Sequence, residues 1–132
     1  MKRPRWIDRL ALLLLHEETL AEHGGLTGLR DETALDAALA RPRHVHAYEH
    51  KADIARLAGA YCYGLVRDHP FNDGNKRAGF LALGLFLSLN GYGLQVAQAE
   101  AAETILLVAA GQISEEALTK WIRKNMIRAR QE

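Results

Sequence analysis

The spacing of apolar residues divides the chain into six segments with helical periodicity. Glycine, proline and polar turns separate these segments, and we expect helices over about residues 7–23, 32–41, 52–67, 75–89, 99–110 and 115–130. Within the fourth segment, residues 78–89 are apolar or small except for Ser88, which predicts a helix buried on nearly all sides. The pattern therefore predicts an all-α fold, a compact six-helix bundle around a buried central helix, formed as a single domain by residues 1–132.

Residues at the expected helix ends support these boundaries. Gly24 and Gly25 follow the first helix, and glycine readily adopts the left-handed conformation that ends a helix. Asp31 is an N-cap candidate for the second helix, and Pro42 is expected to close it because proline restricts the residue before it. The polar, histidine-rich residues 42–50 lack a clear period, so we expect a loop or a short hairpin there.

Composition agrees with an all-α fold and narrows the class of protein. The chain has 21 Leu and 21 Ala against 6 Ile and 4 Val, and the first two residue types favour helices whereas the branched ones favour strands. A formal net charge of +1 gives the chain no general attraction for nucleic acid. We therefore expect a helical protein that does not bind nucleic acid directly.

No segment of the sequence predicts a membrane span or a disulfide. The apolar runs are shorter than the about 20 residues that cross a bilayer, and no signal-peptide cleavage site follows them. The single cysteine, Cys62, excludes an internal disulfide and is expected to be a small buried side chain. We therefore expect a soluble, cytoplasmic protein.

Residues 69–77 concentrate chemically capable side chains between two apolar helices, in the order His-Pro-Phe-Asn-Asp-Gly-Asn-Lys-Arg. His69 titrates near neutral pH and is suited to take a proton from a hydroxyl nucleophile. Asp73 offers an oxygen ligand for Mg²⁺, which proteins bind through one or two carboxylates together with phosphate oxygens. Gly74 permits backbone shapes that are closed to other residues.

Asn75, Lys76 and Arg77 fall on the first turn of the following helix, where free N–H groups and the helix dipole attract anions. Two cations at this end weaken a helix unless an anion such as a polyphosphate reverses the local charge. A base, a magnesium ligand and a phosphate cradle together indicate phosphoryl or nucleotidyl transfer to a hydroxyl. From composition alone, an ordinary Asn-Asp-Gly turn followed by a solvated Lys-Arg pair explains the segment equally well.

Residues 69–77 also match the signature of the Fic/Doc family, written H-x-F-x-[DE]-[GA]-N-[GK]-R, at every defined position. Lys76 resembles the Doc branch, the death-on-curing toxins of toxin–antitoxin pairs. Further stretches resemble the same branch: Leu15-His16, Gly24-Gly25-Leu26, Gly28-Leu29-Arg30-Asp31, Ala38-Leu39-Ala40-Arg41-Pro42 and Asn90-Gly91. The resemblance extends over most of the chain and implies a Fic/Doc-like fold.

The resemblance implies a role for most residues of the segment. His69 would activate the target hydroxyl, Asp73 would hold Mg²⁺, and Phe71 would point into the core and fix the loop. Four residues are implied to bind the phosphates of ATP: Gly74, Asn75, Lys76 and Arg77. Lys76 is also implied to be catalytic.

The residue at position 76 bears on which group is transferred. Fic enzymes with glycine there transfer AMP, whereas Doc-like proteins with lysine bind the nucleotide the other way round and transfer the terminal phosphate. The resemblance thus implies a kinase-like transfer from ATP to a threonine of elongation factor Tu, which stops translation, and a cognate antitoxin as neutralising partner. The alternatives are AMP transfer, a catalytically silent antitoxin-binding module, and a small magnesium nuclease, against which the near-neutral charge argues.

Other polar residues are expected to be structural. Residues 42–50 contain three histidines that could suggest a zinc or nickel site: His44, His46 and His50. No cysteine or carboxylate of convincing spacing completes such a site, so we expect solvated loop histidines. His16 is expected to make a structural hydrogen bond. Arg30 is expected to serve a turn, although it could reach the active cleft, and Arg67 is a candidate for a phosphate contact.

Overall fold

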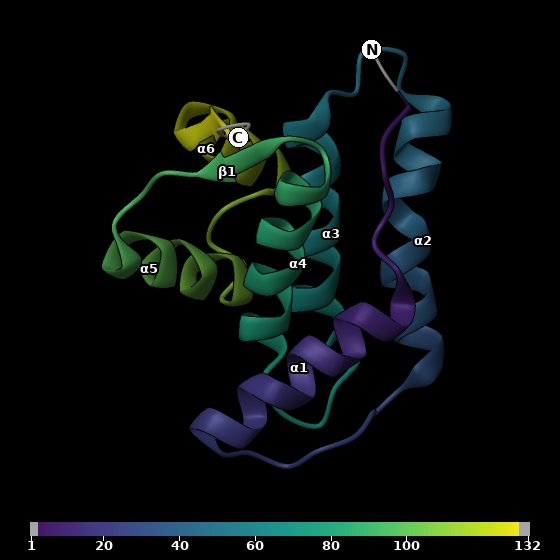
Figure 1. Ribbon diagram of the computed structural model, residues 1–132, viewed down its shortest axis with the longest axis vertical. Helices are drawn as coiled ribbons and strands as arrows, with labels where there is room; N and C mark the ends of the chain where they lie inside the picture. Colours follow the sequence, from purple (N-terminus) through teal and green to yellow (C-terminus); the bar gives the residue numbers. More distant parts are fainter. Residues whose placement is uncertain (1–2, 130–132) are drawn as a thin grey trace.

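The computed structural model describes residues 3–129, and Figure 1 shows how its helices are arranged. In this part of the chain the helices are α1 (Arg9–His23), α2 (Glu32–Tyr48), α3 (Ile54–Asp68), α4 (Asn75–Leu89), α5 (Gln98–Ala109) and α6 (Glu115–Asn125). Two short strands, β1 (Tyr92–Leu94) and β2 (Met126–Arg128), accompany the described helices. The predicted all-α fold with six helices is confirmed.

Helix α3 is the central helix of the fold. Eleven of its 15 residues are buried, and it packs against α2, α4, α5 and α6. Small residues let these neighbours approach closely, since a Cβ at Gly59 would lie only 2.6 Å from Oγ1 of Thr119 on α6.

Asp53 caps the N-terminus of α3 and ties it to α6. Its Oδ1 accepts a hydrogen bond from the N–H of Arg56 at 2.9 Å, and its carboxylate also pairs with the Arg123 guanidinium at 2.9 Å. Partial burial would raise the pKa of the Asp53 carboxyl, but the hydrogen bonds from Arg123 and from the Arg56 N–H outweigh this and lower the pKa below its usual value.

Helix α4 lies beside α3, and the prediction that residues 78–89 are buried on nearly all sides is wrong. Gly84 and Ser88 are exposed, whereas one face of α4 packs on α3. On that face a Cβ at Gly79 would lie 2.5 Å from Cγ2 of Val66. A run of uncharged residues does not by itself distinguish one-sided from complete burial. No helix within residues 3–129 is long and apolar enough to cross a membrane.

Pro42 lies inside α2, so the predicted helix end at Pro42 and the predicted loop over residues 42–50 are wrong. Proline lacks the N–H that would bond to the carbonyl four residues earlier, which weakens a helix locally. However, Leu35, Ala38 and Pro42 are buried on one face, and Val45 continues this face against the core. Burial of this continuous face outweighs the local effect of proline.

The histidines of residues 42–50 consequently lie on α2 and in the turn after it. His46 packs edge-on against Trp6, with ring centroids 5.7 Å apart, while His44 and His50 are exposed. Within residues 3–129, no group of three or more His, Cys, Asp or Glu side chains is arranged to hold a metal ion.

The C-terminal segment leaves the helical conformation earlier than predicted. Helix α6 ends at Asn125, and β2 then pairs antiparallel with β1, placing Met126 opposite Leu94. The predicted continuation of the helix over residues 126–129 is therefore wrong, and position 130 lies outside the described residues. Three-residue strands are too short to show the alternation of apolar and polar positions from which strands are predicted.

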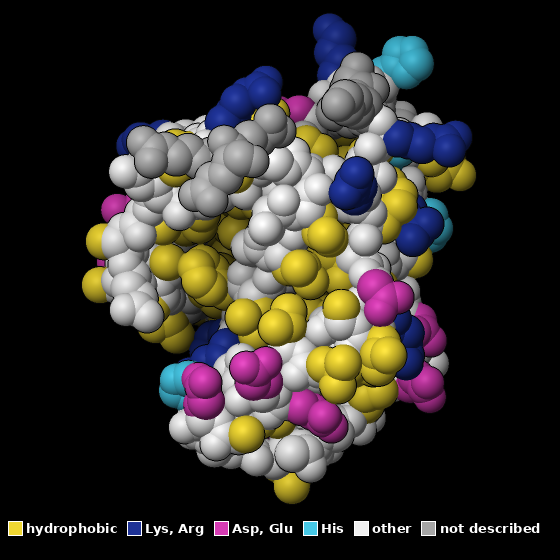
Figure 2. Space-filling view, viewed as in Figure 1, with side chains coloured by type: hydrophobic (Ala, Val, Ile, Leu, Met, Phe, Trp, Pro, Cys, Tyr) yellow, Lys and Arg dark blue, Asp and Glu magenta, His cyan; other side chains and the backbone are white. Residues whose placement is uncertain are grey.

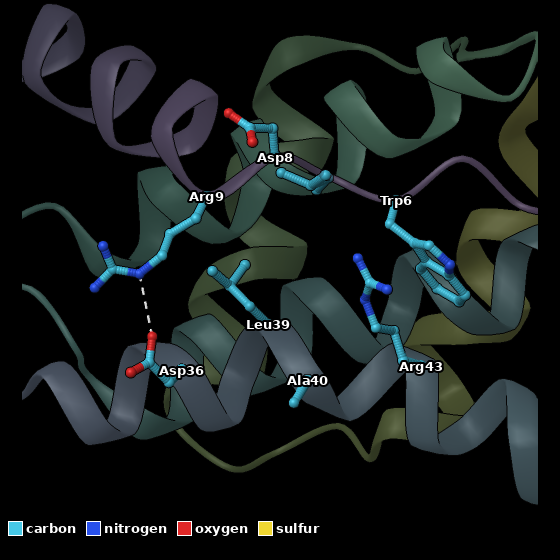
Figure 3. A pocket seen from close by; sticks show the side chains of 8 residues that line it. Trp6, Asp8, Arg9, Asp36, Leu39, Ala40 and Arg43 are labelled. Carbon is cyan, nitrogen blue, oxygen red and sulfur yellow. Dashed lines mark hydrogen bonds and ion pairs between the residues drawn. The ribbon is translucent and has the colours of Figure 1, made fainter.

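The N-terminal segment runs in extended form along α2 before α1 begins (Figure 1). A cleft of about 460 Å³ lies between this segment and α2, as Figure 3 shows. Arg9 pairs with Asp36 across it at 3.1 Å, and the Arg43 guanidinium lies 5.2 Å from the centre of the Trp6 ring. None of the residues lining this cleft belongs to residues 69–77. The contacts of Arg9 with Asp36 and of Arg43 with Trp6 hold the N-terminal segment on α2.

Candidate active site

Residues 69–74 form the loop between α3 and α4, so the motif of residues 69–77 covers this loop and the first turn of α4. His69 follows the last residue of α3 and adopts the left-handed conformation, with φ 50° and ψ 56°. Among the described residues it is the only non-glycine residue with a positive φ. Its side chain is exposed, so the imidazole is accessible to a hydroxyl of another molecule.

The segment that precedes α2 lies against the loop and fixes its backbone. Leu29 and Phe71 form an antiparallel bridge, and the N–H of Arg30 donates to the carbonyl of Pro70 at 2.8 Å. The Arg30 guanidinium donates to the carbonyl of His69 at 2.6 Å, a contact between residues 39 apart in the sequence. Arg30 was predicted to serve a turn, with the alternative that it reaches the active cleft, and these bonds to the loop backbone were not predicted.

Phe71 anchors the loop in the core, as the resemblance implied. It is 2% exposed, and its ring stacks on that of His16 with centroids 3.7 Å apart and an interplanar angle of 20°. Nε2 of the buried His16 lies 2.8 Å from the carbonyl oxygen of Asp73, which can only accept, so Nε2 carries the proton. The predicted structural hydrogen bond of His16 is confirmed.

The Asn75 side chain joins the loop to the start of α4. Its Oδ1 accepts from the N–H of Phe71 at 2.9 Å, and its Nδ2 donates to the carbonyl of Phe71 at 3.0 Å. Both polar ends of the amide therefore bond to the backbone of the loop. For phosphate binding, the role that the resemblance implied, Asn75 retains its backbone N–H in the first turn of α4 and the second hydrogen of Nδ2.

Asp73 is exposed on the loop and is oriented by a backbone donor. Its Oδ2 accepts from the N–H of Leu26 at 2.6 Å, and no other described residue bonds to its Oδ1. One oriented carboxylate fits Mg²⁺, which takes its remaining ligands from phosphate oxygens and water. The donor set around Asp73 is therefore compatible with magnesium bound together with a nucleotide.

The N-terminus of α4 is free of a side-chain cap. Gly74 is its N-cap residue, with φ 75° and ψ 25°, and glycine has no side chain that could bond to the free N–H groups of the helix. A Cβ at this position would lie 3.1 Å from Nε2 of His16, so both the backbone conformation and the close contact favour glycine. Lys76 and Arg77 are exposed in the first turn and add positive charge to that of the free N–H groups.

A groove of about 460 Å³ lies between α4 and α5, and we name it the α4–α5 groove. The residues lining it are His23, Lys76, Arg77, Phe80, Gln98, Ala101, Ala102, Ile105 and Leu106. Figure 2 shows hydrophobic side chains in a hollow beside α5, with basic and histidine side chains near its lower edge. An apolar groove of this size with a few convergent charges is suited to a small ligand that carries an anionic group.

Arg67 and Cys62 do not line the α4–α5 groove. Arg67 donates from Nη1 to the carbonyl of Ala109 at 3.1 Å, at the end of α5, rather than lining the α4–α5 groove. Cys62 is fully buried, and this burial raises the pKa of its thiol to about 12. The prediction that Cys62 is a small buried side chain is confirmed.

Some groups around the motif could not be recognised from the sequence. Ile105 and Ala101 of α5 have ordinary core spacing, and nothing in that spacing marks them as a groove wall. Leu26 acts through its backbone N–H, which leaves no signal in the residue type. The glycine pair before it is a signal, since a Cβ at Gly25 would lie 3.3 Å from the Cβ of Asp73.

Comparison with known proteins agrees with the motif. The model of the family described as the Fic/DOC family matches residues 6–87, which include α1 to α3 and the whole loop. The protein "Protein kinase doc" of Escherichia phage P1 is 32% identical over 121 residues, covering 91% of this chain and 94% of the phage protein. "Toxin Doc" of Mycolicibacterium smegmatis is 41% identical over 72 residues, covering 54% of this chain and 55% of that protein. This chain belongs to the Fic/DOC family.

Proposed function

We propose that this protein is the toxin of a toxin–antitoxin pair and transfers the terminal phosphate of ATP to a hydroxyl of a protein target, with a threonine of elongation factor Tu as the expected acceptor. The observation that carries the proposal is the grouping of His69, Asp73 and Lys76 on one rigidly held loop and helix turn beside the α4–α5 groove. The names of the two relatives, a protein kinase and a toxin, support it.

In the proposed reaction the acceptor hydroxyl oxygen forms a bond to the terminal phosphorus of ATP, and the bond from that phosphorus to the ADP oxygen breaks. His69 takes the proton of the hydroxyl, a role in which a general base contributes about 10²–10⁴-fold to the rate. Its exposed imidazole suits an acceptor that belongs to a second protein and must approach from solvent.

The phosphates would lie at the start of α4. Lys76, Arg77 and the free N–H groups of the first turn are preorganised donors for their negative charge. Mg²⁺ held by Asp73 would neutralise part of the phosphate charge. A lysine at position 76 fills space that glycine would leave open, which favours the nucleotide orientation that presents the terminal phosphate to the acceptor.

Labelled ATP tests which group is transferred. We would incubate the protein with elongation factor Tu and with ATP labelled either in the terminal or in the α-phosphate, and expect label on the acceptor from the terminal phosphate alone. Label from the α-phosphate, with AMP attached, would contradict the proposal in favour of AMP transfer. His69→Ala should lower the rate about 10²–10⁴-fold, whereas His44→Ala, which changes an exposed histidine on α2, is the matched control and should not.

Growth of cells tests the toxin assignment. Expression of this chain alone should arrest the growth of cells, because it would act in the cytoplasm on elongation factor Tu. Co-expression of the cognate antitoxin should restore growth. His69→Ala should also restore growth. Arrest that persists with His69→Ala would instead favour a catalytically silent binding module.

A further inference from the structure

The backbone of His69 is held in a conformation that its own side chain disfavours. Left-handed φ and ψ values are ordinary for glycine but unfavourable for a residue with a Cβ atom. Such a residue persists only where surrounding contacts over-determine it, and these positions gather at functional sites. The conformation of His69 therefore needs an identified support.

Arg30 supplies that support through two charge-assisted hydrogen bonds. Its Nε donates to the carbonyl of His69 at 2.6 Å, and its Nη2 donates to the carbonyl of Asp68 at 2.9 Å. Asp68 is the last residue of α3 and His69 is its C-cap, so neither carbonyl has a donor within the helix. A cation at this end also complements the negative end of the helix dipole.

Arg30 is itself attached to rigid structure. Asp31, the next residue, caps α2 by accepting from the N–H of Ala34 at 3.1 Å, and the N–H groups of Arg30 and Asp31 both donate to the carbonyl of Pro70. The carbonyls of residues 68–70 are thus all bonded to Arg30 and Asp31. Arg30 does not line the α4–α5 groove.

We propose that Arg30 is a positioning residue for His69, which it serves by fixing the left-handed backbone that directs the imidazole out of the end of α3. The inference rests on the proposed function, in which His69 is the base. Without the guanidinium, residue 69 relaxes toward negative φ and the imidazole leaves the position from which it takes the acceptor proton. Nucleotide binding is unchanged, because the phosphate donors are on α4 and the Asp73 carboxylate is oriented by the N–H of Leu26 rather than by Arg30.

Steady-state kinetics of Arg30→Met test this separation. We expect kcat for phosphate transfer to fall about 10–100-fold, the effect of misplacing a catalytic group by about 1 Å, while KM for ATP changes less than about twofold. The kcat of Arg30→Lys should lie between those of the unaltered protein and Arg30→Met, because an ammonium cannot reproduce the planar fork that reaches both carbonyls. The matched control is Arg67→Met, which removes a guanidinium bonded to the carbonyl of Ala109 at the end of α5, and it should keep kcat within about twofold.

A double variant distinguishes positioning from a general loss of structure. Adding Arg30→Met to His69→Ala should cause no further loss, because Arg30 acts through an imidazole that is already absent. If Arg30→Met lowers the residual rate by the same factor in both backgrounds, the inference is wrong. The histidine ring signals in NMR give a readout besides activity: Arg30→Met should shift those of His69 and leave those of His44 unchanged.

The outcomes separate the two claims. Phosphate transfer by the unaltered protein together with normal kcat in Arg30→Met would overturn the role of Arg30 and leave the proposed function standing. Absence of phosphate transfer by the unaltered protein would overturn the proposed function, and unshifted His69 signals would then overturn the hold of Arg30 on the backbone. Should Arg30→Met fail to fold, as judged by circular dichroism, Arg30→Lys decides through the same two measurements.

Discussion

Replacing Asn75 with alanine tests how firmly the loop is attached to α4. The substitution removes the acceptor of the Phe71 N–H and the donor to the Phe71 carbonyl, at 2.9 and 3.0 Å. Phe71 is 2% exposed, so water does not readily replace either partner. With a net value of about 0.5–1.5 kcal/mol for each hydrogen bond, we expect the free energy of unfolding to fall by about 1–3 kcal/mol.

Urea unfolding followed by circular dichroism measures this loss, and two variants calibrate it. Asn75→Asp keeps an acceptor for the Phe71 N–H and loses only the donor, so it should lose about 0.5–1.5 kcal/mol. Asn72→Ala removes an exposed amide of the same loop, whose Nδ2 donates to the carbonyl of Thr27 at 2.9 Å, and should lose less than about 1 kcal/mol because water can take its place.

The result that would refute this reasoning is a free energy of unfolding for Asn75→Ala within about 0.5 kcal/mol of the unaltered protein. Hydrogen exchange adds an independent check, because the amide of Phe71 should exchange faster in Asn75→Ala than in Asn72→Ala. If Asn75→Ala and Asn72→Ala destabilise equally, burial of the Asn75 bonds has no special importance.

Two further predictions concern the scaffold. Because the folded-state pKa of the Asp53 carboxyl lies below its unfolded value of about 3.9, the charged carboxylate stabilises the fold above that pH, and this contribution disappears as the pH falls through the folded-state pKa. Urea unfolding should show Asp53→Asn, which keeps the N-cap, less stable by about 0.2–1 kcal/mol at pH 7, and this difference should shrink as the pH falls below about 3.9. An undiminished difference at low pH would contradict this. Gly79→Ala places a Cβ 2.5 Å from Val66 and should destabilise by about 1–3 kcal/mol. At Gly84 an added Cβ meets no atom within 4 Å, so Gly84→Ala should stabilise the fold by about 0.5–1 kcal/mol. Thermal unfolding should therefore show a lower melting temperature for Gly79→Ala and a higher one for Gly84→Ala, and changes of the same sign would contradict this packing of α4.

The helices were predictable where the local sequence and the tertiary packing agree. The end of α1 at two glycines and the N-cap of α2 at Asp31 are local signals, and the structure has both. The end of α2 was not predictable, because the local effect of Pro42 opposes burial of a face that only the packing against α3 reveals. The prediction of the end of α6 was wrong for a related reason, since β2 forms only when β1 is brought beside it.

The site divides in the same way. His69, Asp73 and Lys76 lie within eight consecutive residues, so one short motif could identify the loop and its chemistry. The groups that hold this loop come from elsewhere: Arg30 lies 39 residues before His69, and His16 lies 57 residues before Asp73. Only the fold brings such residues together, and their types alone are common in surface turns and helix interiors.

The N-terminus of α4 differs from those of the other described helices. Four of the described helices begin with a side-chain cap: Asp8 for α1, Asp31 for α2, Asp53 for α3 and Ser114 for α6. Helix α5 has no cap but carries an acidic residue, Glu100, in its first turn, which suits the helix dipole. Helix α4 has neither, and its first turn carries two cations, Lys76 and Arg77. A local arrangement that weakens a helix in an otherwise consistent sequence is expected at a functional site, and a bound polyphosphate would supply both the missing acceptor and the missing negative charge.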